Sequence, residues 1–271
     1  MNHAHDNSSG SLIARTFTDA RRKGIAVPAY PGETPDSLAA AYAIQDEAIR
    51  LWPDRIAGWK LGRVPPPFDV QFGAGRLAGP IFSRNVWSAV DGQPTAFGVI
   101  DGGFAAVEAE YVLELAETPA DRDGWTPDAA ADLVGRVLVG VEIAGSPFAE
   151  INGHGPAVTA SDFGNNAGLI LGGAVADWRA RLMDLTCETR IDDAVIGTGG
   201  ATSIPNGPLD SLAFLLNLMH RRGRRLEAGQ LISTGAATGV HQIFIGQSAV
   251  ADFGPDGRIA CVAVEAKGDA A

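Results

Sequence analysis

The sequence contains little cysteine and no long apolar segment. Its two cysteines, Cys187 and Cys261, show no metal-binding spacing, and we expect both to be small core residues in a reducing cytoplasm. No apolar run approaches the roughly 20 residues of a transmembrane helix. The segment 1–10 lacks the hydrophobic stretch of a signal peptide and is expected to form a disordered tail. These absences argue against a disulfide-stabilised, secreted or membrane-spanning protein.

Positive charge is also scarce, since the chain carries a formal net charge of −11 over 271 residues. Nucleic acids and anionic membranes select basic surfaces, so neither is expected as the main partner. The basic cluster at 221–225 follows an apolar helix, and positive charge suits the carboxyl end of a helix. No phosphate-binding loop, dinucleotide motif or Gly-x-Ser-x-Gly elbow is present. Nucleotide binding through such motifs and serine-hydrolase chemistry therefore find no support.

The pattern of elements predicts an α+β protein. Hydrophobic residues make up 46% of the chain and charged residues 20%, which is enough for a substantial core. One helix is predicted over residues 12–23, and a second from a Thr34 N-cap to about Trp52. The later part of the chain consists mostly of strands and includes a hairpin that turns at Asp192-Asp193.

The predicted domain organisation has three parts. After the tail at 1–10, residues 11–80 are expected to form a small helical region with a lid loop. The lid loop is placed at 63–80, where proline and glycine are frequent and no regular element is predicted. Residues 81–271 are expected to form a β-rich, metal-binding catalytic domain.

Three glutamates lie where strands are expected to bury apolar side chains. The stretch Phe104–Ala116 alternates with a period of two, which places Glu108 and Glu110 together on one face. Glu142 interrupts the nearly continuous apolar run Val137–Ala144. An unpaired carboxylate in such surroundings costs several kcal/mol, so it must be neutralised, paired or bound to a metal.

The three carboxylates can supply oxygen ligands to one hard divalent cation. Mg²⁺ or Mn²⁺ fits best, because no Cys or His stands nearby to favour zinc. The alternative is that strand 104–116 is half solvated and its glutamates face water, which suits Glu114 best. It suits Glu142 poorly, because both flanks are apolar and β-branched. The sequence therefore predicts a metal site formed by Glu108, Glu110 and Glu142.

Five short motifs give the chain a family resemblance. In chain order they are Gly58–Gly62, Glu108–Glu110, Glu142-Ile143, Ser161–Gly168 and Ser233–Gly235. From about Leu12 to Val264 the chain resembles the fumarylacetoacetate hydrolase superfamily and, within it, the 2-keto-4-pentenoate hydratase group. The resemblance implies a mixed β-roll on which the three glutamates hold Mg²⁺ or Mn²⁺. By analogy it also implies a homo-oligomer.

The resemblance further implies a small 2-oxo or 2-hydroxy-dienoic acid as substrate, with its carboxylate and C2 oxygen on the metal. Lys60 would be catalytic, either holding the substrate oxygen as an ammonium or relaying protons. Asp162 would be catalytic by positioning a water or another group. A cap or turn role for Ser161 and Asp162 stays open beside it.

Substrate-binding roles are implied for Ser161, Thr234, Gly235 and Arg63. Thr234 and Gly235 would offer a hydroxyl and a backbone N–H to the substrate carboxylate. Arg63 either pairs with a second carboxylate of the substrate or is a solvated loop residue.

The leading hypothesis is a metal-dependent hydro-lyase of aromatic catabolism, which hydrates a 2-hydroxy-2,4-dienoate to a 4-hydroxy-2-oxo acid. The lid acid of the resembled hydratases is missing from Leu77–Ser83. The alternative is therefore a decarboxylase of a 2-oxo-3-enedioate, of the 4-oxalocrotonate type, which needs less proton machinery. A non-catalytic 2-oxo acid binding homologue is the third hypothesis. The resemblance also disfavours hydrolysis of a β-diketone, because the C–C hydrolases of this superfamily use a His–Glu dyad ahead of the metal glutamates, and no histidine lies between His5 and His154.

Overall fold

The computed structural model describes residues 3–268 of the chain. Helix α1 spans His3–Lys23 and thus begins well before the predicted start at Leu12. Most of the segment expected to be a disordered tail is therefore helical, while residues 1–2 lie outside the described range. Gly10 and the polar residues before it have low intrinsic helix propensity, which is why the sequence predicts a later start.

The other helices are shorter than α1. They are α2 (Leu38–Leu51), α3 (Phe68–Phe72), α4 (Pro127–Ala131), α5 (Pro156–Ser161), α6 (Trp178–Arg181) and α7 (Pro208–Arg221). Helix α2 begins later than predicted, because the Ser37 side chain, and not that of Thr34, accepts a hydrogen bond from the backbone N–H of Ala40 at 3.2 Å. Among the helices described, none combines the length and apolar character that a membrane crossing requires.

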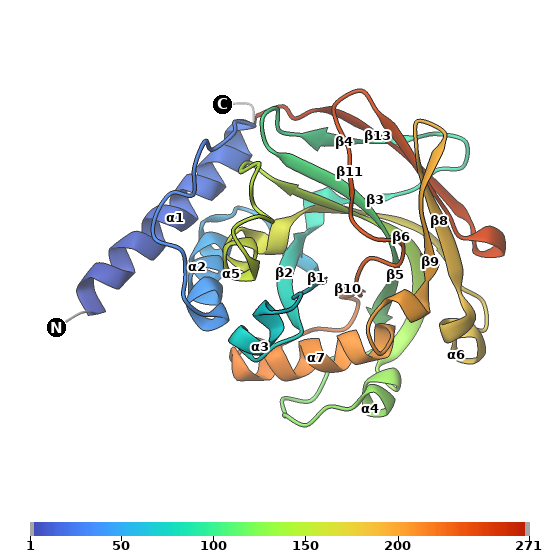
Figure 1. Cartoon of the computed structure of the whole chain (residues 1–271). Coiled ribbons are helices and arrows are strands. Elements are labelled where there is room, and N and C mark those ends of the chain that lie inside the picture. The colour runs from blue at the N-terminus through green and yellow to red at the C-terminus, as the bar shows by residue number, and fades with distance from the viewer. Residues whose placement is uncertain (1–2, 269–271) are drawn as a thin grey trace.

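The strands form two sheets (Figure 1). Their bounds are β1 (Ile56–Arg63), β2 (Arg76–Phe82), β3 (Val86–Ser88), β4 (Thr95–Val99), β5 (Phe104–Leu115), β6 (Val134–Ser146), β7 (Asn166–Ala174), β8 (Thr186–Ile191), β9 (Ala194–Gly200), β10 (Leu231–Ser233), β11 (His241–Gln242), β12 (Ser248–Asp252) and β13 (Arg258–Glu265). The eight-stranded sheet has the order β2-β1-β10-β5-β6-β7-β3, with β11 paired to β5. The five-stranded sheet has the order β4-β13-β12-β8-β9. Each sheet combines parallel and antiparallel pairs, which confirms the predicted mixed α+β fold.

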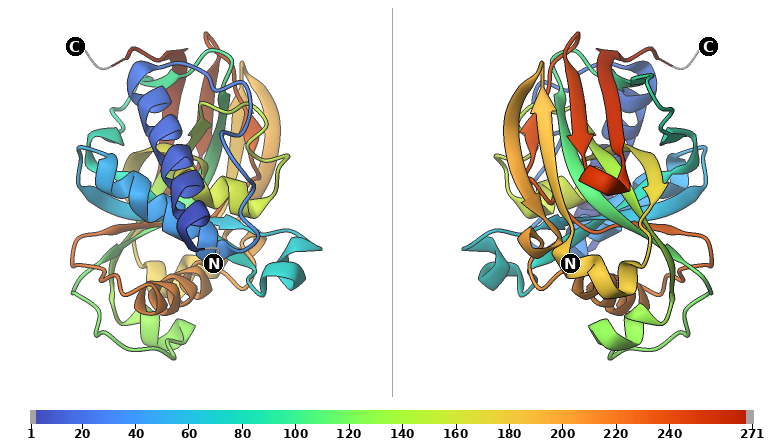
Figure 2. Two further views of the ribbon diagram at one scale, coloured as in Figure 1. Left: turned by 90° about the vertical axis from the view of Figure 1, so that its left-hand side faces the viewer. Right: turned by 90° about the vertical axis from the view of Figure 1, so that its right-hand side faces the viewer.

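The main core lies where the two sheets face each other. Tyr111 of β5 packs edge-on against Phe253, which follows β12, with ring centroids 5.7 Å apart. Val139 of β6 and Ile259 of β13 are fully buried in the same core cluster. The turned views of Figure 2 show α1 and α2 on one side of the molecule and the β8, β9, β12 and β13 strands on the other.

The predicted lid loop is shorter in the structure. Strand β2 begins at Arg76, so it takes up the end of the segment at 63–80, and it pairs antiparallel with β1 along its whole length. Proline is tolerated there because β2 is an edge strand, where Pro80 lies opposite Trp59 without interrupting a central ladder. The irregular part reduces to the chain around α3. The boundary expected at residue 80 falls inside β2, so β1 and β2 belong to the large sheet.

The other predicted elements are present close to their expected positions. The hairpin between β8 and β9 turns at Asp192 and Asp193, whose positive φ angles of 47° and 67° suit a tight two-residue turn. Helix α7 begins at Pro208, as predicted from the helix-starting preference of proline. Its Ser211 side chain donates to the backbone oxygen of Thr234 at 2.8 Å, which connects the helix to the segment after β10.

Candidate metal centre

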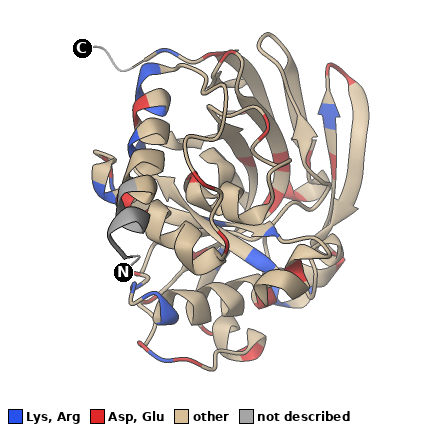
Figure 3. Ribbon diagram, turned by 60° about the vertical axis from the view of Figure 1, so that its left-hand side comes forward, with Lys and Arg blue, Asp and Glu red and all other residues tan. Residues whose placement is uncertain are grey.

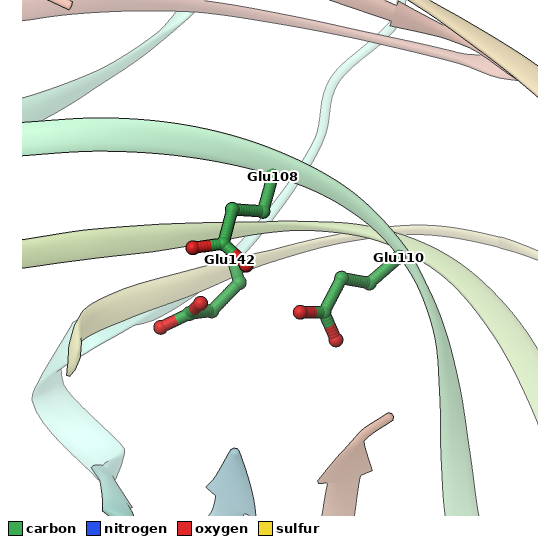
Figure 4. Close-up of side chains that lie close together, drawn as sticks. All are labelled: Glu108, Glu110 and Glu142. Atoms are coloured by element: carbon green, nitrogen blue, oxygen red, sulfur yellow. The ribbon is translucent and has the colours of Figure 1, made fainter. Parts of the chain in front are cut away.

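Three buried glutamates on β5 and β6 converge (Figure 4). Glu108 and Glu142 are direct partners in the antiparallel register, and Glu110 lies two residues further along β5. One carboxylate oxygen of each residue lies within 4.8 Å of the others, and the side chains point toward one another. Their exposed fractions are 5%, 0% and 0% for Glu108, Glu110 and Glu142. The structure therefore brings together the three predicted metal ligands.

The alternation of β5 explains why the glutamates share one face. Val107, Ala109 and Tyr111 point the other way, into the core between the sheets. The glutamate face continues along the strand into a small apolar cluster that includes Val112. Figure 3 shows acidic residues on interior strands as well as on helices and loops. Glu108 and Glu110 are therefore buried and do not face water. Glu114, at the end of the strand, is partly exposed.

Lys60 of β1 completes the charged cluster. Its Nζ lies 3.2 Å from Oε2 of Glu142, and its side chain is 5% exposed. Burial lowers the pKa of Lys60, but the carboxylates of Glu142, Glu108 and Glu110 outweigh burial and raise it above its ordinary value. Lys60 is therefore an ammonium. Three carboxylates and one ammonium leave two negative charges, which one divalent cation balances.

The carboxyl groups are costly to bury in their charged form. Burial raises the pKa of Glu108, Glu110 and Glu142 above the ordinary value. The ammonium of Lys60 opposes this rise at Glu108 and Glu142, whereas at Glu110 the neighbouring carboxylates add to it. A cation in this cluster would offset the cost of burying so much negative charge.

Protein donors cover one oxygen of two of the glutamates. Asn166 Nδ2 donates to Oε1 of Glu142 at 2.7 Å. Ser233 Oγ and the backbone N–H of Gly235 both donate to Oε2 of Glu110, at 2.5 Å and 2.9 Å. Sequence reasoning included Ser233 and Asn166 in family-like motifs but assigned them no role. Their proximity to the glutamates arises only when β7 and β10 join the sheet.

The remaining oxygens of the same two glutamates have no hydrogen-bond partner among the described residues. They are Oε1 of Glu110 and Oε2 of Glu142, both fully buried. Oε2 of Glu142 forms only the ion pair with Lys60. Oε1 of Glu110 has neither a hydrogen bond nor an ion pair among the described residues. Buried carboxylate oxygens that accept no hydrogen bond, at the centre of an acidic cluster, are the kind of ligand that Mg²⁺ or Mn²⁺ prefers. The residues present therefore fit a hard divalent cation.

A cavity of about 630 Å³ opens beside the cluster. Glu108 and Lys60 line it, so the charged cluster is in contact with the space that a ligand would fill. Apolar side chains line other parts, including Phe68 of α3 and Leu77 of β2. Such a combination of apolar walls and a few polar groups is typical of small-molecule sites. Asn165 also lines the cavity and was not predicted; its buried Oδ1 has no hydrogen-bond partner within residues 3–268.

Thr234, Gly235 and Arg63 line this cavity, as predicted. However, the Thr234 hydroxyl donates to the backbone oxygen of Tyr111 at 2.6 Å. The Gly235 N–H is likewise taken, because it donates to Glu110. The sequence predicted that both groups would donate to a substrate carboxylate. In the structure neither donor is free to do so. Arg63 is exposed and has no ion-pair or hydrogen-bond partner in the part of the chain that the structure describes.

Ser161 and Asp162 are not brought to the cavity. The Asp162 carboxylate is fully buried and accepts from Arg21 Nε at 2.7 Å and from Ser146 Oγ at 2.6 Å. Ser161 Oγ donates to the backbone oxygen of Val158 at 2.7 Å and contacts the Tyr30 hydroxyl. The bonds of Asp162 join α1 and β6 to the segment before β7, and those of Ser161 connect α5 to Tyr30. We therefore assign both residues a structural role. The turn alternative left open by the sequence is the one that agrees with the geometry.

Comparisons with known proteins agree with this architecture. No protein-family model matches the chain. A 2-keto-4-pentenoate hydratase of Paraburkholderia phymatum is 26% identical over 241 residues, which are 85% of this chain and 88% of that protein. The structure of 4-oxalocrotonate decarboxylase from Pseudomonas putida G7, complexed with magnesium and adipate, superposes with a TM-score of 0.79 at 19% identity. That match covers 95% of this chain and 98% of the other.

A more distant match is fumarylpyruvate hydrolase from Pseudomonas aeruginosa, in complex with Mn²⁺ and pyruvate. It has a TM-score of 0.57 at 13% identity and covers 79% of this chain and 91% of the other. These matches confirm the resemblance to the fumarylacetoacetate hydrolase superfamily that the sequence motifs indicated. These similar proteins are named as a hydratase, a decarboxylase and a hydrolase, and the two solved structures hold Mg²⁺ and Mn²⁺. Together with the three buried glutamates, these names support an enzyme with a divalent-metal site and do not distinguish its reaction.

Proposed function

We propose that the protein is a Mg²⁺- or Mn²⁺-dependent hydro-lyase that converts a 2-hydroxy-2,4-dienoate into a 4-hydroxy-2-oxo acid. The observation that carries this proposal is the buried cluster of Glu108, Glu110, Glu142 and Lys60 at the wall of a ligand-sized cavity. The relative named as a 2-keto-4-pentenoate hydratase supports the choice of reaction.

The hydration is a balanced addition of one water. C5 and C3 each gain a proton, C4 gains a hydroxyl, and the C2 hydroxyl loses its proton to become the ketone. A Mg²⁺ or Mn²⁺ ion held by the three glutamates would supply Lewis-acid stabilisation of negative charge on the C2 oxygen. Lys60 Nζ, at the cavity wall, is placed to donate a hydrogen bond to the same oxygen.

A second candidate is decarboxylation of a 2-oxo-3-enedioate at the same cluster. One observation favours it: Arg63 is an unpaired guanidinium on the cavity wall, where it can receive a second substrate carboxylate. The lid acid of the resembled hydratases is also missing. Strand β2 (Arg76–Phe82) supplies only apolar and glycine residues after Arg76, so the cavity gains no acid from it.

A progress-curve experiment distinguishes the two reactions. Freshly generated 2-hydroxypenta-2,4-dienoate and 2-oxo-3-hexenedioate are each followed by conjugated absorbance and by CO₂ release, with Mg²⁺ and after EDTA treatment. Metal-dependent loss of the dienoate without CO₂ is the expected result. Release of CO₂ from the diacid instead would establish the decarboxylase. Tight binding of either compound without turnover would identify a non-catalytic 2-oxo acid binding homologue.

The same proposal includes a symmetric homo-oligomer and a place in the catabolism of aromatic ring-cleavage products. Symmetric assemblies are the usual form of soluble oligomers. Sedimentation equilibrium of the protein in Mg²⁺ buffer tests the first part, and a purely monomeric sample would contradict it.

A further inference from the structure

The hydrogen bonds around two of the glutamates are arranged asymmetrically within each carboxylate. Glu110 has two donors on Oε2, Ser233 Oγ and the Gly235 N–H, while its Oε1 has none. Glu142 has the Asn166 amide on Oε1, while its Oε2 accepts no hydrogen bond. In both carboxylates the protein donates hydrogen bonds to one oxygen. Among the described residues, the other oxygen has no partner at Glu110 and only the Lys60 ammonium, 3.2 Å away, at Glu142.

This asymmetry decides how each carboxylate can bind a cation. A carboxylate whose two oxygens are both free can rotate and chelate a cation with both. Each carboxylate oxygen has two lone pairs, so Oε2 of Glu110, which accepts two hydrogen bonds, must lose one of them to chelate a cation. The hydrogen bond from Asn166 fixes the orientation of the Glu142 carboxylate and disfavours the rotation that bidentate chelation requires. Mg²⁺ requires near-octahedral coordination by single oxygens, whereas Ca²⁺ accepts six to eight oxygens and readily takes bidentate carboxylates.

We propose that Asn166 and Ser233 are positioning residues that restrict Glu142 and Glu110 to single-oxygen coordination and thereby make the site prefer Mg²⁺ over Ca²⁺. The inference rests on the metal site of the proposed function and is independent of which reaction occurs there. Both residues act through a glutamate, and both are buried, with exposed fractions of 4% and 0%.

Ser146 provides a matched control. It is a buried serine on a strand, and its Oγ donates to a buried carboxylate, Asp162, at 2.6 Å. Ser233 donates to Glu110 at 2.5 Å in the same way. Ser146→Ala and Ser233→Ala therefore remove equivalent hydrogen bonds, but only one of the two carboxylates belongs to the metal cluster.

The test is calorimetric titration of the EDTA-stripped full-length protein with Mg²⁺ and, separately, with Ca²⁺. We expect Asn166→Ala and Ser233→Ala to weaken Mg²⁺ binding by about 10- to 100-fold. We expect Ca²⁺ binding to weaken by less than about threefold, because the released carboxylate can chelate with both oxygens. The ratio of the two dissociation constants therefore shifts toward Ca²⁺ by about tenfold. Ser146→Ala is expected to leave the ratio unchanged.

Two outcomes overturn the inference. One is an equal loss of Mg²⁺ and Ca²⁺ affinity, which indicates a general loss of structure. The other is a ratio that moves no further in Ser233→Ala than in Ser146→Ala. Ser233→Ala keeps the Gly235 donor on Glu110, so it provides a milder variant where Asn166→Ala fails to fold. If the unaltered protein binds neither cation, the metal site of the proposed function itself is refuted, and this result is distinct from an unchanged ratio.

Discussion

Two groups of buried carboxylates in this molecule differ in how many hydrogen bonds the protein donates to their oxygens. One is Asp162 with its partners Arg21 and Ser146, and the other is the cluster of Glu108, Glu110 and Glu142. Asp162 accepts hydrogen bonds from Arg21 and Ser146 on both of its oxygens, at 2.6–2.9 Å. Glu110 and Glu142 each retain one buried oxygen without any hydrogen bond. All three side chains are excluded from solvent to the same degree.

This difference is the reason that we assign Asp162 a structural role and propose Glu110 and Glu142 as metal ligands. A satisfied buried charge holds two segments together, here α1 and the segment before β7. A buried carboxylate oxygen that accepts no hydrogen bond in the folded protein needs a partner from outside the chain, such as a cation. The family resemblance alone made Asp162 a candidate catalytic residue. Its hydrogen bonds, and its absence from the cavity wall, are the reasons that we assign it a structural role.

The largest effect is expected from removing the partner of the satisfied cluster. Arg21→Met leaves the Asp162 carboxylate buried without its cation, which should lower the free energy of unfolding by about 3–5 kcal/mol. Urea denaturation monitored by circular dichroism measures this loss. Adding Asp162→Asn to the same variant should recover part of it. A loss below about 1 kcal/mol in Arg21→Met would remove the contrast between the clusters.

Glu142→Gln tests the glutamate cluster, where the larger effect is expected on metal binding and turnover and the smaller one on stability. The substitution breaks the buried ion pair with Lys60 but also removes one of three neighbouring negative charges, and Glu108 and Glu110 still face Lys60. The two effects offset each other, so the stability of the metal-free protein should fall less than in Arg21→Met. Turnover and Mg²⁺ affinity should fall by about 100-fold or more, since changes to groups that merely support a ligand already cost 10- to 100-fold. Glu114→Gln is the matched control, because Glu114 lies on β5 but pairs with Arg136 at the surface. Equal effects of the two variants would refute the site.

Mg²⁺ should stabilise the folded protein, by about 2.7 kcal/mol when its concentration is 100 times the dissociation constant. Burial raises the pKa of Glu108 to about 8, with Glu110 and Glu142 also raised. Raised pKa values favour the metal-free fold at low pH, and this contribution is lost as pH rises through them. Protons therefore compete with the cation, and the Mg²⁺-induced rise in Tm should be larger at pH 8 than at pH 6. Differential scanning calorimetry checks this; a smaller rise at pH 8 would contradict it.

The smallest effect is expected at the rim of the cavity. Arg63→Gln removes the unpaired guanidinium without touching the metal cluster, because Arg63 is exposed. KM for 2-oxo-3-hexenedioate should rise about tenfold, an effect of about 1.4 kcal/mol. KM for the monoacid 2-hydroxypenta-2,4-dienoate should stay within about twofold. Equal changes for both compounds would show that Arg63 does not bind a second carboxylate.

The local pattern of the sequence was sufficient to place the metal cluster. A period of two on β5 puts Glu108 and Glu110 on one face, and a buried strand carries Glu142. These are properties of short segments, in which each residue's environment is set by its immediate neighbours. The fold class and most elements follow from the same local signals. The start of α1 and the strand β2 did not, because low helix propensity and a high content of Pro and Gly are overridden by tertiary packing.

The partners of each polar group depended on contacts between segments distant in the sequence. Arg21 reaches Asp162 across 141 positions, and Ser233 reaches Glu110 across 123. No local pattern encodes such a pair, because the strand order that joins β10 to β5 is a property of the whole chain. The sequence therefore identified the three buried glutamates, and the folded structure showed which of their oxygens accept no hydrogen bond from the described residues.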